Sequence, residues 1–240
     1  MNAPLHNIHI VLVETRSAGN IGSTARAMKN MGLSNLCLVN PQCELKAEAL
    51  WMATNARDIL NHARQVPSLR EAIAGAGYVF GTTARKRRMR TFSSPREMAP
   101  RALALAAHNP VAIVFGSEDK GLSNQQLELC NEVISIPTAP DGTSLNLSHA
   151  VIIICYELHS ATHDKIIHEA PPRAPIDEVE RMYDHMRNVL CEIGFLNSQN
   201  PEHTLGSFRR ILSRAGLTST DVKLIRGLFR QLLWYINKTK

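Results

Sequence analysis

The chain has 240 residues, of which 44% are hydrophobic, and its formal net charge at pH 7 is +6. That length supports one good hydrophobic core with a small appendage. A positive charge fits an anionic partner, but many proteins are mildly basic, so the clustering of the charges has to decide. The N-terminal segment lacks a basic region, and no apolar run is long enough for a signal peptide or a membrane span. We therefore expect a cytoplasmic protein.

The cysteines and histidines give no metal-site pattern. The five cysteines are odd in number, widely spaced and without a CxxC pair, which favours reduced core thiols over disulfides or zinc. Cys155, His159 and His163 fall at four-residue spacing, but no further acidic, Cys or His partner is adjacent on that helical face. We therefore expect no metal.

Continuous apolar runs alternate with helical patterns along about the first 160 residues. Continuous rather than alternating runs are typical of parallel strands that are covered on both faces. The expected strands are Ile8–Val13, Leu36–Val39, Tyr78–Thr82, Val111–Phe115 and Val133–Ile136, and the expected helices are Asn20–Met31, Glu44–Asn61, a short helix capped by Ser68, Pro95–His108 and one that begins near Asn146. The alternation predicts an α/β fold with an open parallel sheet.

The pattern changes after His168. The segment Glu169–Pro175 is rich in proline, cannot continue a helix and indicates a stiff, extended linker. Three helical patterns without any strand signal follow, at Ile176–Gly194, His203–Ala215 and Ser219–Asn237. We expect a first domain over residues 1–165, a Pro-rich linker over 166–176 and a small all-α extension over 177–240.

Two common nucleotide-binding motifs and one nucleophile motif are excluded. The sequence has no GxxxxGK[ST] and no GxSxG. The glycines Gly75, Gly77 and Gly81 imitate a dinucleotide fingerprint, but they precede a strand instead of following it and opening a helix.

A polar segment follows the first strand, from Asn20 to Arg26. The Asn20 amide can cap or anchor the loop at the strand end, and Gly22 permits a close approach of the backbone. Arg26 lies near the C-terminal edge of the strand, where ligands bind in open α/β sheets. The alternative for Arg26 alone is an exposed helix residue with a solvated head.

Two later strand ends also lead into loops of small residues. Gly116 follows the strand Val111–Phe115, and the residues Gly142, Thr143 and Ser144 precede the helix near Asn146. Small residues in the loops that follow the C-terminal ends of strands favour a binding site at this edge of the sheet.

Three segments resemble, in order and spacing, the motifs of the SPOUT (SpoU–TrmD) RNA methyltransferases. They are NxGxxxR at Asn20–Arg26, FGSEDKGLS at Phe115–Ser123 and IPTAPDGTSLNLSHA at Ile136–Ala150. More narrowly, VETRSAGNIGSTARAMKNMGL, LVNP, GTTAR and the helical tail with FRRILSRAGL are similar to the TrmJ family, over nearly the whole chain. The resemblance implies a parallel sheet with a C-terminal trefoil knot. It also implies a homodimer that methylates the ribose 2′-hydroxyl of cytidine or uridine 32 in the tRNA anticodon loop.

The resemblance also implies the cofactor and the site residues. Arg26 corresponds to the catalytic arginine of the family, and Asn20, Glu118 and Asn146 complete the catalytic set. Because a guanidinium stays protonated at neutral pH, we expect Arg26 to orient the hydroxyl or a phosphate and to stabilise the developing alkoxide rather than to act as a base. The expected contacts to S-adenosylmethionine are Thr82, Thr83, Ala84, Gly116, Ile136, Thr143, Ser144 and Leu145.

Basic clusters fit an RNA partner. One follows Thr82–Ala84 directly, so positive charge borders the expected cofactor loop. The alternative for each cluster is a solvated face. Few aromatic residues accompany the basic faces of the tail, which favours recognition of phosphate and shape over base stacking. The expected RNA-binding residues are Arg85, Lys86, Arg87, Arg88 and Arg90, with Arg209, Arg210 and Arg214 in the tail and Lys223, Arg226 and Arg230 on a further helical face.

Two other functions stay open. One is a SpoU-type 2′-O-methyltransferase that acts on another RNA site, and the other is a non-catalytic RNA-binding module of the same fold. Arg26, Asn146 and the small-residue loops argue against the second. Cofactor binding by the purified protein without RNA would discriminate between enzyme and module.

Overall fold

The structure is a computed structural model of the full chain, and it describes residues 4–84, 92–139, 144–163, 172–197 and 199–239. The chain divides into two compact units, an N-terminal unit over Met1–Ala170 and a C-terminal unit over Pro171–Lys240. Most of the expected linker over 166–176 lies outside the described residues.

Within the described residues, a seven-stranded sheet in the order β3-β2-β1-β6-β4-β7-β5 forms the centre of the N-terminal unit. All of its pairings are parallel. The strands are β1 (Ile8–Val13), β2 (Asn35–Val39), β3 (Arg64–Val66), β4 (Tyr78–Thr82), β5 (Phe92–Ser93), β6 (Val111–Phe115) and β7 (Glu132–Ile134). The prediction of a parallel α/β sheet from five strands is confirmed. The two additional strands, β3 and β5, lie at the edges and are too short to give a sequence signal.

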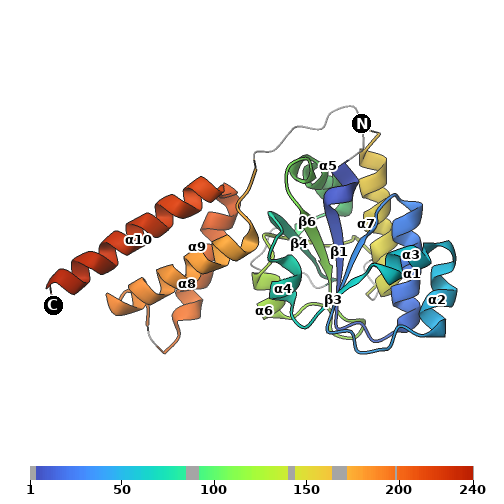
Figure 1. Cartoon of the computed structure of the whole chain (residues 1–240), viewed down its shortest axis with the longest axis horizontal. Coiled ribbons are helices and arrows are strands. Elements are labelled where there is room, and N and C mark those ends of the chain that lie inside the picture. Colours follow the sequence, from blue (N-terminus) through green and yellow to red (C-terminus); the bar gives the residue numbers. More distant parts are fainter. Residues whose placement is uncertain (1–3, 85–91, 140–143, 164–171, 198, 240) are drawn as a thin grey trace. The chain divides into compact units, whose positions relative to one another are not determined.

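Helices cover both faces of this sheet. Figure 1 shows α1, α2, α3 and α7 on one side and α4 and α6 on the other. Helix α7 packs against both α1 and α5, although these helices lie far apart in the sequence. The described helices of this unit are η1 (Pro4–Asn7), α1 (Ala18–Asn30), α2 (Ala47–Ala53), η2 (Thr54–Ala56), α3 (Arg57–Asn61), α4 (Leu69–Ile73), α5 (Pro95–Ala106), α6 (Asn124–Glu128) and α7 (Leu147–Ala161).

Side-chain caps begin several of these helices. The Ser17 hydroxyl accepts a hydrogen bond from the backbone N–H of Asn20 at the start of α1. Ser94 and Glu97 form a capping box at the start of α5. The expected cap at Ser68 is present, because its hydroxyl accepts from the N–H of Glu71 at 3.3 Å. Caps of this kind satisfy N–H groups that have no partner inside the helix.

The segment Glu44–Asn61, which the sequence predicts to be mostly helical, is helical from Ala47 to Asn61 but does not form one continuous helix. The segment is divided into α2, η2 and α3, and the break falls at Thr54, whose φ is +48°. A β-branched residue rarely adopts a positive φ, so the local sequence does not predict this break.

Helices α1 and α2 meet at Gly22. A Cβ atom added there would lie 2.2 Å from the carbonyl oxygen of Ala49 and 2.9 Å from the Cβ of Met52. Only glycine lets the two backbones approach this closely. The contact places the side of α2 that carries Met52 against the first two turns of α1.

The C-terminal unit consists of α8 (Ile176–Glu192), α9 (Pro201–Ala215) and α10 (Ser219–Thr239). The three helices expected from the sequence are therefore present. Their common core is apolar, and α9 ends at Gly216, whose φ of +64° is typical of a helix C-terminus. The buried members of the core include Met182, Tyr183, Met186, Val189, Leu205, Val222 and Phe229.

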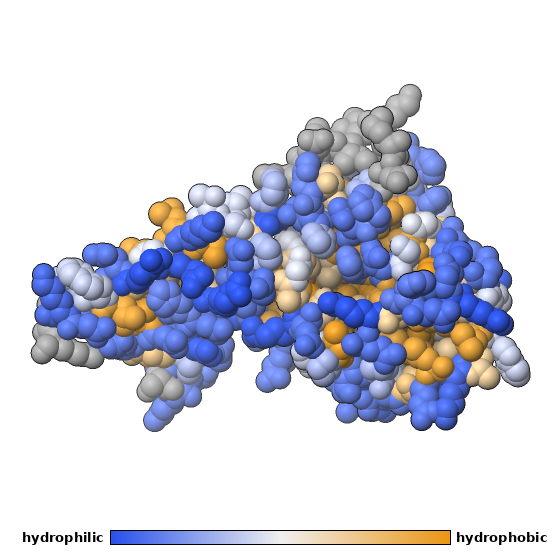
Figure 2. Space-filling model, viewed as in Figure 1, coloured by the Kyte–Doolittle hydropathy of each residue, from blue (hydrophilic) through white to orange (hydrophobic). Residues whose placement is uncertain are grey.

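Hydrophobic side chains also reach the surface. On the face drawn in Figure 2, orange areas interrupt the hydrophilic surface of both units. In the N-terminal unit, the side chains of Trp51 and Tyr156 are 75% and 55% exposed. Among the described residues, no helix has the length and the apolar composition needed to cross a bilayer.

Candidate functional site

Three polar side chains from distant parts of the chain meet at the C-terminal edge of the sheet. The Nδ2 group of Asn146, just before α7, donates to Oδ1 of Asn20 on α1 at 3.0 Å. The Nδ2 group of Asn20 in turn donates to Oε1 of Glu118, which follows β6, at 2.8 Å. Each of the three resembled motifs thus supplies one member of a continuous hydrogen-bonded chain.

Glu118 also receives backbone donors from the loop after β1. Its two carboxylate oxygens accept from the N–H groups of Arg16 and Ser17 at 3.1 and 3.2 Å. Partial burial alone would raise the pKa of Glu118, but the hydrogen bonds from Asn20 and from these backbone groups outweigh burial and lower the pKa below its ordinary value. Glu118 is therefore an anion that fixes the Asn20 amide, and it is a poor base at neutral pH.

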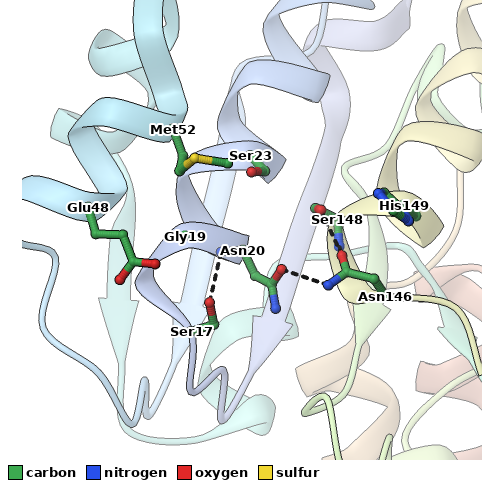
Figure 3. Close-up of a pocket in the computed structure, with 9 residues that line it drawn as sticks. All are labelled: Ser17, Gly19, Asn20, Ser23, Glu48, Met52, Asn146, Ser148 and His149. Carbon is green, nitrogen blue, oxygen red and sulfur yellow. Dashed lines mark hydrogen bonds between the residues drawn. The ribbon is translucent and has the colours of Figure 1, made fainter.

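Asn146 has a second task at the start of α7. Its Oδ1 accepts from the backbone N–H and from the hydroxyl of Ser148 at 2.9 and 2.8 Å, so it caps the helix. Because Oδ1 is occupied in this way, the amide group of Asn146 points its Nδ2 toward Asn20, as Figure 3 shows. The cap therefore fixes which atoms of both amides are donors.

An open cavity of about 360 Å³ is lined by the two asparagines of this chain, Asn20 and Asn146, among other residues. Figure 3 shows residues of α1, α2 and α7 arranged around it. Its volume is at the lower end of the range, roughly 300–1,000 Å³, that is typical of small-molecule sites. The lining residues are Ser17, Gly19, Asn20, Ser23, Glu48, Met52, Asn146, Ser148 and His149.

Sequence reasoning found Asn20 and Asn146 of this lining but missed the residues that α2 contributes. Glu48 lies against the first turn of α1, since a Cβ at Gly19 would be 2.7 Å from its Oε1 atom. Met52 enters the lining because α2 packs on Gly22. A glycine inside a helical pattern was the available signal that another element approaches at this point.

Arg26 does not line this cavity. It is exposed on α1, about one helical turn beyond Ser23, on the side of the helix that carries Gly19 and Gly22. Within the described part of the chain, its guanidinium makes no hydrogen bond or ion pair. The cation is therefore placed at the border of the cavity rather than inside it.

The expected cofactor residues lie at the ends of three strands that are neighbours in the sheet, β6, β4 and β7. The Thr82 hydroxyl donates to the carbonyl of Val114 at 3.0 Å, and the N–H of Thr83 donates to the carbonyl of Ile134 at 3.0 Å. Ile136 packs partly buried against the core, whereas Ser144 and Leu145 are exposed. Thr143 lies outside the described residues.

Backbone packing alone requires a glycine at position 116, whether or not a ligand binds there. A Cβ atom there would lie 2.1 Å from the carbonyl carbon of Gly121 and 2.2 Å from the nitrogen of Leu122. The loop after β6 folds back over the strand end through a bridge between Ser117 and Gly121. A bulky residue at position 116 would therefore displace this loop before it blocked a cofactor pocket.

The basic residues expected to bind RNA fall into different environments. Arg85, Lys86, Arg87, Arg88 and Arg90 lie outside the described residues. Arg210 and Arg214 are exposed one turn apart on α9. Arg209 is different, because its guanidinium forms an ion pair with both carboxylate oxygens of Glu180 and lies 4.3 Å from the centre of the Tyr183 ring. The guanidinium of Arg209 therefore makes its contacts inside the C-terminal unit.

No group of three or more His, Cys, Asp or Glu side chains with metal-binding geometry occurs among the residues that the structure describes. All five cysteines are free. Burial raises the pKa of Cys155 to about 12, so this thiol is an inert core residue. His159 and His163 contact each other edge to face, with ring centres 5.2 Å apart.

The parallel sheet carries the Asn146–Asn20–Glu118 chain at its C-terminal edge, and the comparisons with known families place the protein among the SpoU-type methylases. The model of the SpoU rRNA Methylase family matches residues 7–156, which is most of the N-terminal unit. The model of the C-terminal domain of tRNA methyltransferase TrmJ matches residues 177–240, which span α8 to α10.

Relatives that match nearly the whole chain identify the family more specifically. The tRNA (cytidine/uridine-2′-O-)-methyltransferase TrmJ of Yersinia pestis is 41% identical over 236 residues, covering 95% of this chain and 92% of its own length. The TrmJ of Escherichia coli K12 is 40% identical over 235 residues, covering 95% and 96%. The crystal structure of TrmJ from Zymomonas mobilis superposes with a TM-score of 0.81 at 31% identity, over 93% of this chain and 98% of that one. The chain belongs to the TrmJ family of SpoU-type methylases.

Proposed function

We propose that this chain transfers a methyl group from S-adenosylmethionine to the ribose 2′-hydroxyl of cytidine or uridine 32 in the anticodon loop of tRNA. The relatives in Y. pestis and E. coli bear the name of a tRNA (cytidine/uridine-2′-O-)-methyltransferase. The observation that carries the proposal is the hydrogen-bonded chain from Glu118 through Asn20 to Asn146, which joins all three motif segments at one edge of the sheet. We place the protein in the cytoplasm with its substrate.

The ends of β4, β6 and β7 suit S-adenosylmethionine. They are adjacent, they expose backbone donors and acceptors, and Ile136 supplies an apolar wall that is partly buried against the core. Because Gly116 has no side chain, the loop after β6 can fold closely over the end of the strand. When bound, the cofactor supplies an electrophilic methyl group. We propose that the residues that hold it are Thr82, Thr83, Ala84, Gly116, Ile136, Thr143, Ser144 and Leu145.

The residues around the cavity orient the nucleotide. Asn20 and Asn146 have fixed amide orientations, because Glu118 holds one and the cap of α7 holds the other. Fixed dipoles of this kind stabilise developing charge without reorganisation. The guanidinium of Arg26 makes no hydrogen bond or ion pair within the described residues, so it can bind a phosphate beside the target ribose and stabilise the alkoxide that forms as the 2′-hydroxyl loses its proton.

We also propose the trefoil knot and the homodimer of the SPOUT fold. The knot is supported by the path of the chain, because β7 pairs between β4 and β5 and α7 then returns to pack against α1 and α5. The dimer is supported by the outer face of α7, where Tyr156 is exposed beside the half-buried Ile152 and Ile153. Exposed apolar faces of this kind are typical of interfaces between proteins.

Activity tests the function directly. Transcribed tRNA that carries a cytidine or uridine at position 32 is incubated with the enzyme and labelled S-adenosylmethionine, and the methylated nucleotide is mapped. We expect Arg26→Ala to lower kcat by orders of magnitude while cofactor affinity stays nearly unchanged. The control is Arg70→Ala, an exposed arginine on α4 on the opposite side of the sheet (Figure 1). A wild-type enzyme that methylates no tRNA, or an Arg26→Ala variant with full turnover, would refute the assignment.

The dimer is tested separately by sedimentation. Tyr156→Glu places a charge on the exposed face of α7 and should give a monomer, whereas Tyr78→Phe, which changes a residue in the sheet, should not. A Tyr156→Glu variant that sediments as a dimer would show that α7 does not form the interface.

A further inference from the structure

Helix α10 presents a basic row that the core of the C-terminal unit does not use. Lys223, Arg226 and Arg230 are spaced at three and four residues, so they lie on one side of the helix. All three are exposed. Within the described part of the chain, neither Arg226 nor Arg230 makes a hydrogen bond or an ion pair. Trp234, which is 54% exposed, continues the row one turn after Arg230.

A histidine from the neighbouring helix lies at the centre of this row. His185 on α8 packs edge to face against the ring of Phe229, with ring centres 6.3 Å apart. Phe229 immediately precedes Arg230 and follows Arg226 by three residues, so both arginines are neighbours of the ring that His185 contacts, and the charges of both act on the imidazole. Burial, and then the charges of Arg226 and Arg230, lower the pKa of His185 below its ordinary value. In the free protein, three potential cations are therefore held together against their mutual repulsion.

No carboxylate of the described C-terminal unit forms an ion pair with His185, Arg226 or Arg230. Glu180 pairs with Arg209, and Asp184 and Glu202 pair with Arg187, where α9 packs on α8. Asp177 pairs with Arg181, and Asp221 accepts from Thr218 at the start of α10. On α8 itself, Glu178 and Glu192 lie two turns from His185 in either direction, about 10 Å along the helix axis. Within the described part of this unit, the two arginines therefore have no counter-charge, and a bound anion can supply it.

We propose that His185, Arg226 and Arg230 form a site for an RNA phosphate, and that binding at this site takes up a proton on His185. The proposal rests on the proposed function, since it takes tRNA as the ligand. A phosphate between the two guanidinium groups replaces repulsion with attraction and favours the imidazolium form. The imidazolium then contributes a third charged donor to the phosphate oxygens.

The sign of the pH effect follows by linkage. The pKa of His185 is low in the free protein and rises in the complex, so the complex binds more protons than the free protein and tRNA binds more tightly as the pH falls. An opposite charge within about 4–6 Å changes the proton affinity of a group by about tenfold or more. We therefore expect tRNA to bind roughly tenfold more tightly at a pH where His185 is protonated in the complex than at pH 8, beyond any change from other groups.

The experiment compares the full-length wild type, His185→Gln and His203→Gln at constant ionic strength. His203 is an exposed histidine on α9 and controls for the general effect of removing an imidazole. The dissociation constant for tRNA is measured between pH 6 and 8, and histidine C–H resonances are titrated with and without tRNA; the resonance that disappears in His185→Gln belongs to His185. We expect the wild type and His203→Gln to bind more tightly at low pH, His185→Gln to lose that gain, and the pKa of His185 to rise when tRNA binds.

Two further variants complete the test. Arg226→Gln and Arg230→Gln should each raise the pKa of His185 in the free protein and reduce the salt dependence of tRNA binding by about one phosphate contact. An unchanged His185 titration in the presence of tRNA, or an equal pH dependence in His185→Gln, would overturn the proposal. So would inorganic phosphate that raises the pKa as much as tRNA does, because the site would then serve a small anion. Methyl transfer by the wild type, measured in parallel, separates these outcomes from a failure of the proposed function.

Discussion

The ion pair between Arg209 and Glu180 allows a quantitative prediction for the C-terminal unit. The side chain of Glu180 is 7% exposed and that of Arg209 is 18% exposed. Arg209→Met leaves the carboxylate of Glu180 buried without its partner, which costs about 3–5 kcal/mol in comparable sites. The partial exposure of Arg209 places the expected loss at the lower end, about 3 kcal/mol. A unit of this length has a total stability of roughly 4–10 kcal/mol, so the variant should lose a large part of it.

The two tryptophans of the chain make this loss measurable. Trp51 belongs to the N-terminal unit and Trp234 to the C-terminal unit. In a Trp51→Phe background, urea unfolding followed by fluorescence reports on α10 alone. We expect the midpoint to fall by about 2–3 M, since the slope for a small domain is roughly 1–1.5 kcal/mol per M.

A double variant separates the loss of the pair from the loss of packing. Glu180→Leu combined with Arg209→Met removes both charges and should regain most of the stability, because a hydrophobic pair of similar volume replaces a buried ion pair at little cost. The double variant should also bind tRNA with an unchanged salt dependence, because the guanidinium of Arg209 is already paired with Glu180. A single variant with wild-type stability, or a double variant with a reduced salt slope, would refute the structural role of Arg209.

Two further predictions concern the N-terminal unit. Glu118→Gln removes the anion that accepts from Asn20, Arg16 and Ser17; we expect a loss of about 1 kcal/mol, after allowing for solvent screening, and a larger loss in kcat than in tRNA affinity. The pKa of Glu118 in the folded protein lies below its ordinary value of 4.5. The stability that the Glu118 carboxylate contributes is therefore fully present above pH 4.5 and is lost as the pH falls through the folded pKa. The stabilities of the wild type and Glu118→Gln should converge in acid. A constant difference down to low pH would contradict this. Gly22→Ala should destabilise by about 1–2 kcal/mol in chemical unfolding, because the new Cβ would meet the Ala49 carbonyl oxygen at 2.2 Å. The matched control Gly206→Ala, in the interior of α9 with no atom within 4 Å of the new Cβ, should instead stabilise by up to about 1 kcal/mol; equal effects at both sites would show that helix propensity alone decides.

The parts of the fold that the sequence predicts are those with a local cause. Continuous apolar runs give β1, β2, β4, β6 and β7, and Ser68 and the capping residues near Pro95 give helix starts. Strand β3 has no such cause, because Arg64 and Gln65 are exposed and pair only through the free edge of β2. Its existence depends on a neighbour that is distant in sequence.

For the site too, the sequence predicts the features with a local cause and does not predict those that depend on distant contacts. Asn20 and Asn146 can be named from their motifs, but they are 126 positions apart, and their hydrogen bond depends on how α7 packs beside α1. The role of Glu118 depends on that packing too, because the donors that lower its pKa come from the loop after β1. A motif can therefore indicate which residues meet, whereas the protonation state and the direction of each amide follow only from the assembled contacts.

Arg209 and Arg210 show that neighbouring residues in one basic run can have opposite environments. Leu205, Phe208 and Leu212 repeat at three- and four-residue spacing and mark the face of α9 that packs on the core. Arg209 follows Leu205 by four residues and so lies on that face, where Glu180 and Tyr183 of α8 receive it. Arg210 lies about 100° further round the helix and is exposed with Arg214. The helical period thus distinguishes residues that a count of basic residues treats alike, and it leaves two of these three arginines, Arg210 and Arg214, exposed on α9.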